Sequence, residues 1–94
     1  MEKKVFKIPR VNVIESDEGF SVEVLGRTGL KYVQGERTLH IDSEILMGHP
    51  DIMIGASRII KWETGEVIDV KTKEKIIDNI RRAFAFRGFE IDFR

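Results

Sequence analysis

Alternation of apolar and polar positions dominates the first two thirds of the chain and predicts β-strands. In the stretch FSVEVL, which begins at residue 20, apolar residues alternate with Ser21 and Glu23, as a half-buried antiparallel strand requires. Before it, apolar residues between Val5 and Ile14 surround Pro9. Because proline lacks the N–H that a ladder needs, it marks an edge strand or a break between two short strands.

The stretch GLKYVQGERTLHIDSE, residues 29–44, has the pattern of a β-hairpin. A two-residue loop at Gly35 and Glu36 is of the Gly-X type that hairpins favour. The register that follows pairs Gln34 with Arg37, Tyr32 with Leu39, and Leu30 with Ile41. The apolar partners then share one face, and the other, mostly polar face carries Lys31, Val33, Thr38 and His40.

The segment after this hairpin is predicted to mix one helical turn with further strands. The stretch DSEILMG predicts a single turn of helix, because Asp42 or Ser43 can cap it and Gly48 can end it. DIMIG and SRIIKWETGEVIDV predict strands, with a turn at residues 64–65.

One amphipathic helix is predicted near the end of the chain, in the stretch TKEKIIDNIRRAFAF. Thr72 can cap its start and Gly88 can end it. Its apolar stripe consists of Ile76, Ile77, Ile80, Ala83 and Phe84. The closing stretch FEIDFR alternates again and predicts a last strand. The chain is therefore expected to form a single α+β domain over residues 1–94: a mostly antiparallel sheet of short strands and hairpins packed by one C-terminal helix, with a final C-terminal strand.

Composition narrows the classes of function. Hydrophobic residues make up 41% of the chain and charged residues 34%, which suits one core and a charged exterior. Sixteen basic residues balance sixteen acidic ones, so no overall field draws the molecule to nucleic acid or anionic lipid. The absence of cysteine excludes disulfides, thiolate nucleophiles and Cys-based zinc sites. MEKKVFKIPR lacks the apolar run of a signal peptide, and no run is long enough to span a bilayer. We expect a cytoplasmic protein with no nucleic-acid or membrane partner.

His40 is the first residue to consider for catalysis, because Asp42 lies two positions on and shares its strand face. No serine or cysteine nucleophile accompanies the pair, so we interpret His40 as a solvent-facing strand residue. His49 precedes a proline and falls in a predicted loop. The spacing of the two histidines and the nearby carboxylates fits no zinc framework. We expect no catalytic residue, no metal and no cofactor.

Charge and aromatic residues point to a protein partner. Residues 71–87 contain six basic and two acidic residues. The acidic residues that balance this positive charge lie mainly in residues 15–18 and 42–69. We interpret the basic side chains of residues 71–87 as a solvated helix face. If the separated charges bind anything, they suit a protein better than a nucleic-acid backbone. Trp62 is the only tryptophan and is interpreted as core rather than interface. Phe86 lies off the apolar stripe, so it either packs under the last helical turn or forms an exposed contact patch.

The order of landmarks along the chain carries more information than any one of them. A glycine-rich turn, a tyrosine, a Gly-Glu-Arg turn and a Ser-Glu pair are followed by ASRIIKW and the helix KIIDNIRRAF. This order resembles a family of small bacterial immunity proteins found in polymorphic toxin systems, over about residues 19–93. The family pattern falls on Gly26, Gly29, Tyr32, Glu36, Arg37, Ser43, Glu44 and Trp62.

The resemblance implies a non-enzymatic inhibitor that binds a cognate toxin protein in the producing cell. A few aromatic or arginine anchors would carry such binding, and the candidate contact residues are Tyr32, Glu36, Arg37 and Trp62. Two alternatives stay open. One is a protein-interaction or scaffold domain, a monomer or a homodimer that pairs through an edge strand or through Phe86. The other is a small hydrolase or nuclease that uses His40.

Overall fold

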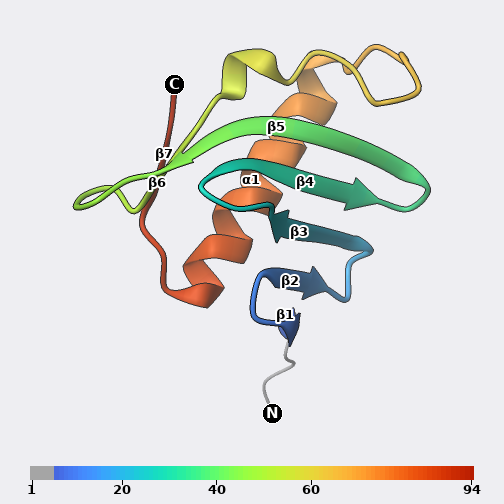
Figure 1. Cartoon of the computed structure of the whole chain (residues 1–94). Coiled ribbons are helices and arrows are strands. Elements are labelled where there is room, and N and C mark those ends of the chain that lie inside the picture. The colour runs from blue at the N-terminus through green and yellow to red at the C-terminus, as the bar shows by residue number, and fades with distance from the viewer. Residues whose placement is uncertain (1–5) are drawn as a thin grey trace.

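A seven-stranded sheet, curled around one long helix, forms the framework of the computed structural model, which describes residues 6–94 (Figure 1). The strands lie side by side in chain order. They are β1 Phe6–Arg10, β2 Val13–Ser16, β3 Phe20–Val24, β4 Thr28–Gln34, β5 Arg37–Ile45, β6 Ile52–Ile54 and β7 Ile91–Phe93. Neighbours are antiparallel except for β6 and β7, which are parallel because the helix α1, Val70–Arg87, forms the crossover between them. The predicted α+β class is confirmed.

The hairpin formed by β4 and β5 has the predicted register. Tyr32 pairs with Leu39, and Gln34 pairs with Arg37 on either side of the two-residue loop. Gly35 has a φ of 62°, a left-handed conformation that glycine adopts without strain. Turn chemistry and alternation agree here, which is why a local pattern was sufficient to set the pairing.

The predicted helical turn after this hairpin is wrong, because β5 continues through it to Ile45. Ser43 is buried and pairs with Ile54, so the strand keeps alternating past the point where a cap was expected. A neighbouring strand, β6, supplies the hydrogen bonds that a six-residue helix would have to make alone. The extension places Ile45 on the same face as the core residues of β5.

The strands predicted between Ser57 and Val70 are also largely absent from the structure. A short 3-10 helix, η1 Ala56–Arg58, is followed by an irregular loop with a single bridge between Lys61 and Val67. The predicted turn is present, since the N–H of Gly65 donates to the carbonyl of Trp62 at 2.8 Å. The loop is tied to β5 by the N–H of Glu63, which donates to the Thr38 carbonyl at 2.9 Å.

Helix α1 ends as predicted but begins earlier. Asp69, not Thr72, is the N-cap, and its carboxylate accepts the N–H of Thr72 at 2.7 Å. At the other end Gly88 has a φ of 88° and donates back into the last turn. The N–H of Phe89 donates to the Phe84 carbonyl at 2.9 Å, which turns the chain toward β7.

The two edge strands of the sheet, β1 and β7, lie in segments that the sequence predicts to be strands, although their lengths differ from the prediction. Pro9 lies within β1, an edge strand, where a missing N–H costs no ladder bond. Val5, which was expected to begin this apolar segment, lies outside the described residues. The final strand is shorter than predicted and occupies the opposite edge.

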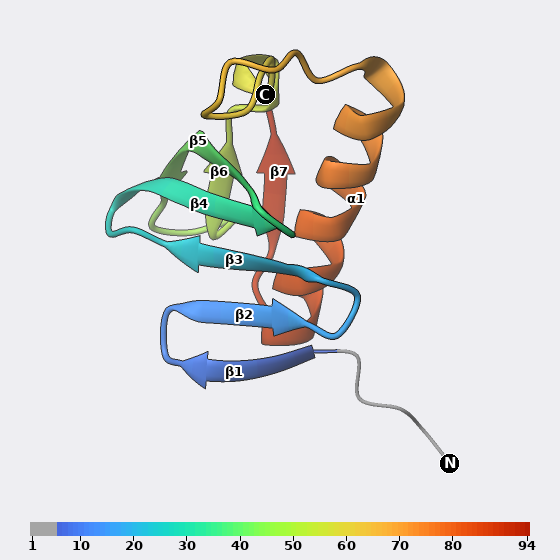
Figure 2. The ribbon, with the colours of Figure 1, turned by 90° about the vertical axis from the view of Figure 1, so that its right-hand side faces the viewer.

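The core lies between α1 and the inner face of the sheet, the face toward the helix (Figure 2). Four residues of the predicted helical stripe are buried, and Ile77 is partly buried. Asn79 is buried among them although it is polar. Burial of each large apolar side chain contributes about 1.5–3 kcal/mol, which is what holds the short strands together. Within residues 6–94 no helix has the length and apolarity to cross a membrane.

Candidate functional site

The tip of the β4–β5 hairpin presents two of the predicted contact residues, Glu36 and Arg37. Both are exposed: Glu36 lies in the two-residue loop, and Arg37 is the first residue of β5, paired with Gln34. The guanidinium of Arg37 donates to Glu66 Oε2 at 3.1 Å and lies 5.7 Å from the ring centroid of Trp62. These contacts orient the arginine while leaving half of its side chain in solvent. The hairpin tip, Glu36 and Arg37, is therefore an ordered charged surface.

The other two predicted contact residues, Tyr32 and Trp62, are core residues. Tyr32 is 0% exposed and Trp62 is 3% exposed. Their rings stack with centroids 6.3 Å apart, and the guanidinium of Arg37 lies over the Trp62 ring. Neither ring has surface to offer a partner in this conformation, so both support the hairpin tip from below. The interpretation of Trp62 as core is confirmed.

A buried polar network ties this hairpin to the helix. The Tyr32 hydroxyl donates to Gln34 Oε1 at 2.6 Å and accepts from Asn79 Nδ2 at 2.8 Å. Arg82 then donates to Asn79 Oδ1 at 2.7 Å and to the Glu18 carboxylate at 2.8 Å. Burial raises the pKa of the Tyr32 hydroxyl above its ordinary value, although the Asn79 donor acts in the opposite direction. The network explains why Asn79 occupies a buried position on the helix.

His40 does not pair with Asp42, the carboxylate that was considered as its catalytic partner. Its Nδ1 lies 2.7 Å from Oε1 of Glu63, which comes from the loop after η1, and both side chains are about half exposed. Asp42 instead faces Arg58, with 3.7 Å between Oδ2 and Nε. The interpretation of His40 as a solvent-facing residue is confirmed. Among these contact residues, His40 has no neighbouring serine or cysteine nucleophile to activate.

His49 lies in a loop, as predicted, and faces a carboxylate from the other end of the chain. Its Nδ1 is 2.6 Å from Oε1 of Glu90. This contact raises the pKa of His49 above its ordinary value, with Asp51 adding a smaller effect. Within residues 6–94 no three His, Asp or Glu side chains are grouped so that they could hold a metal ion.

Phe86 packs against the edge strand rather than under the last helical turn, and it remains partly exposed. Its ring centroid lies 5.4 Å from that of Phe6, so it packs against the edge strand β1. At 47% exposure it still presents apolar surface beside the end of the helix.

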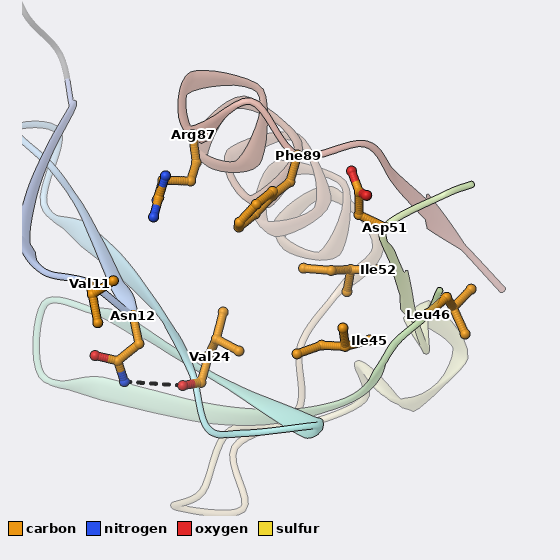
Figure 3. A pocket seen from close by; sticks show the side chains of 9 residues that line it. All are labelled: Val11, Asn12, Val24, Ile45, Leu46, Asp51, Ile52, Arg87 and Phe89. Atoms are coloured by element: carbon orange, nitrogen blue, oxygen red, sulfur yellow. Dashed lines mark hydrogen bonds between the residues drawn. The ribbon is translucent and has the colours of Figure 1, made fainter. Parts of the chain in front are cut away.

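An apolar groove of about 390 Å³ opens at the opposite end of β4 and β5 from the hairpin tip (Figure 3). It lies between the C-terminal end of α1 and the ends of β3 and β5. Nine residues line it: Val11, Asn12, Val24, Ile45, Leu46, Asp51, Ile52, Arg87 and Phe89. We call this surface the end groove. Its walls are mainly apolar, and Val11, Ile45 and Phe89 are exposed.

The end groove was missed because its residues come from five separate segments of the chain. One signal was available: the alternation of β5 continues past Ser43 to Ile45, which predicts an apolar residue on the inner face beyond the hairpin. Interpreting this segment as a helical turn hid that signal. The contribution of Phe89 depends on the chain turning back after Gly88, which no strand or helix pattern indicates.

In a scan against models of protein families, residues 21–94 match the family described as Immunity protein 74. The matched region runs from β3 to the end of β7 and contains the hairpin tip and most of the end groove. Comparisons with curated proteins and with solved structures give no match.

Proposed function

Because the chain belongs to the Immunity protein 74 family, we propose that it binds a cognate toxin domain and neutralises it in the cytoplasm of the cell that produces the toxin. The family match over residues 21–94 carries this proposal. An immunity protein acts by occupying its toxin, so the property to look for is a surface that can form a tight and selective complex.

The surface chemistry supports binding rather than catalysis. His40 and His49 each face a single exposed carboxylate, from Glu63 and Glu90 respectively, and neither lies in a buried constellation of reactive groups. Inhibition would instead be steric and electrostatic: the immunity protein covers the toxin's active site or holds its fold in an inactive form.

We propose that the hairpin tip makes one of the contacts with the toxin. Glu36 and Arg37 lie at the turn of the hairpin, and the Trp62 ring, which itself stacks on Tyr32, supports the guanidinium of Arg37. An arginine that is already ordered loses little side-chain entropy when it binds a carboxylate on a partner. It must, however, exchange Glu66 for that partner, so its contribution favours selectivity over raw affinity.

The first experiment is growth rescue. The toxin domain encoded next to this chain's gene is expressed in a bacterial host with and without this protein, and the two proteins are then copurified. Rescue with a stable complex is the expected result. Toxicity that persists when both proteins are expressed in soluble form would refute the proposed function.

A charge reversal tests the hairpin tip separately. Arg37→Glu is expected to weaken the complex about tenfold, because it removes one favourable charge and adds an opposing one. Lys7→Ala is the matched control: Lys7 is also exposed and ion-paired, with Glu15 at 3.2 Å, but it lies on the far edge strand. Equal binding by both variants would remove the hairpin tip from the interface.

A further inference from the structure

The end groove differs from the hairpin tip in having apolar walls that no part of the described chain covers. Val11 is 82% exposed, Ile45 43% and Phe89 38%. Such side chains gain free energy when a partner removes them from water, at about 25 cal/mol per Å² of apolar surface. Their concentration around one concavity distinguishes this place from apolar residues scattered singly over a surface.

One unpaired positive charge belongs to the wall of the groove. Arg87 extends from the end of α1, as Figure 3 shows, with its guanidinium 5.3 Å from the Phe89 ring centroid. Within residues 6–94 the arginines found in ion pairs are Arg37, Arg58 and Arg82, so Arg87 forms no ion pair there.

The other charged residue of the wall, Asp51, is held by the chain itself. Its carboxylate accepts the N–H of Glu90 at 2.8 Å. Glu90 in turn holds His49. The groove thus offers apolar walls and an arginine without a carboxylate partner, and the chemistry that complements it is an apolar side chain next to a carboxylate.

We propose that the end groove is a docking site for an apolar side chain of the toxin that has an acidic residue beside it. The apolar side chain fills the groove, and the neighbouring carboxylate is bound by Arg87. A nucleic acid fits less well, because its phosphates would contact Arg87 but leave the apolar walls in water. This inference rests on the proposed function and adds to it the chemistry of the partner.

Two pairs of variants test the groove against matched controls. Val11→Asp places a carboxylate at the mouth of the groove, in a turn that accepts aspartate, and Val67→Asp makes the same change at an equally exposed valine elsewhere. Arg87→Gln removes the proposed charge contact. Arg81→Gln removes an arginine of the same helix that also lies over an aromatic ring, that of Phe93 at 5.1 Å, but outside the groove.

Affinity for the toxin domain is measured by calorimetry at two salt concentrations, after the unfolding midpoint of each variant has been shown to match that of the wild type. We expect Val11→Asp to weaken binding at least tenfold and Arg87→Gln about fivefold, with a flatter salt dependence for the latter. The controls Val67→Asp and Arg81→Gln are expected to stay within twofold of the wild type.

The outcomes separate the two proposals. Tight wild-type binding that neither Val11→Asp nor Arg87→Gln weakens would overturn the groove assignment and leave the immunity function in place. Failure of the wild type to bind or neutralise the toxin would overturn both. If Val11→Asp instead converts a dimer of this chain into a monomer and leaves toxin affinity unchanged, the occupant is a second copy and the proposal is wrong.

Discussion

Removal of the Tyr32 hydroxyl is the most direct test of the network that fixes the hairpin to the helix. In Tyr32→Phe the ring remains, so the stacking on Trp62 changes little. Asn79 Nδ2 loses its acceptor at 2.8 Å, and Gln34 Oε1 loses its donor at 2.6 Å. Gln34 is partly exposed and can bind water instead, whereas Asn79 is 3% exposed and cannot.

The expected cost follows from this asymmetry. A buried donor left without an acceptor costs about 1–3 kcal/mol, while a group that recovers a water partner costs little. We therefore expect Tyr32→Phe to lower the free energy of unfolding by about 2 kcal/mol. For a chain of this size, each 1 kcal/mol shifts the melting temperature by about 4–8 °C, so the loss is well within measurement.

Urea denaturation, followed by the fluorescence of the buried Trp62, gives the free energy directly. Asn79→Leu and the double variant with Tyr32→Phe complete a cycle. Because the double variant leaves neither the Tyr32 hydroxyl nor the Asn79 amide without its partner, it is expected to be at least about 1 kcal/mol more stable than the sum of the single changes predicts. A Tyr32→Phe protein within about 0.5 kcal/mol of the wild type, or strict additivity in the cycle, would refute the argument.

Three further predictions concern the ends of α1 and the surface histidine of the β5–β6 loop. Gly88→Ala is expected to cost about 1 kcal/mol in urea denaturation, because its φ of 88° strains any other residue although no atom obstructs the new side chain; an unchanged midpoint would contradict this. The pKa of Asp69 is lowered by its hydrogen bond to Thr72. This cap therefore stabilises the protein above the ordinary aspartate pKa, and the stabilisation is lost as the pH falls through the lowered pKa of Asp69. The difference in melting temperature between the wild type and Asp69→Ala should shrink on acidification. The pKa of His49 is raised by Glu90. The contact between them therefore stabilises the protein below the ordinary histidine pKa, and this stabilisation is lost as the pH rises through the raised pKa of His49. An NMR titration should show the pKa of His49 returning toward its ordinary value in Glu90→Gln.

The parts of the fold that the sequence predicts are those set by local rules. The β4–β5 register follows from a two-residue loop at Gly35 and strict alternation on either side of it. The helix and its end at Gly88 follow from a 3.6-residue apolar period and a glycine that can adopt a positive φ. In each case the determining residues lie within a few positions of one another.

The errors arise where distant segments decide the outcome. Whether Ser43 caps a helix or sits in a strand depends on β6, which pairs with it from across a loop. Whether Trp62 lies in a strand depends on how its loop docks against β5, through the bond from Glu63 to Thr38. Tyr32 was predicted as a contact residue for its chemistry, but its position opposite Asn79 of the helix places it in the core.

The nine residues of β5 connect two surfaces of different physical character, and this difference predicts how each would contribute to a complex. At one end Arg37 already has Glu66 and the Trp62 ring as partners, so binding exchanges one set of polar contacts for another and adds little net free energy. At the other end Ile45 and its neighbours leave water only when a partner arrives, which is a net gain. Charge changes at the hairpin tip should therefore act mainly on the association rate and its salt dependence, and changes in the end groove mainly on the dissociation rate. Stopped-flow measurements on Arg37→Glu and Val11→Asp would separate these effects, and a dissociation rate left unchanged by Val11→Asp would contradict the assignment of affinity to the groove.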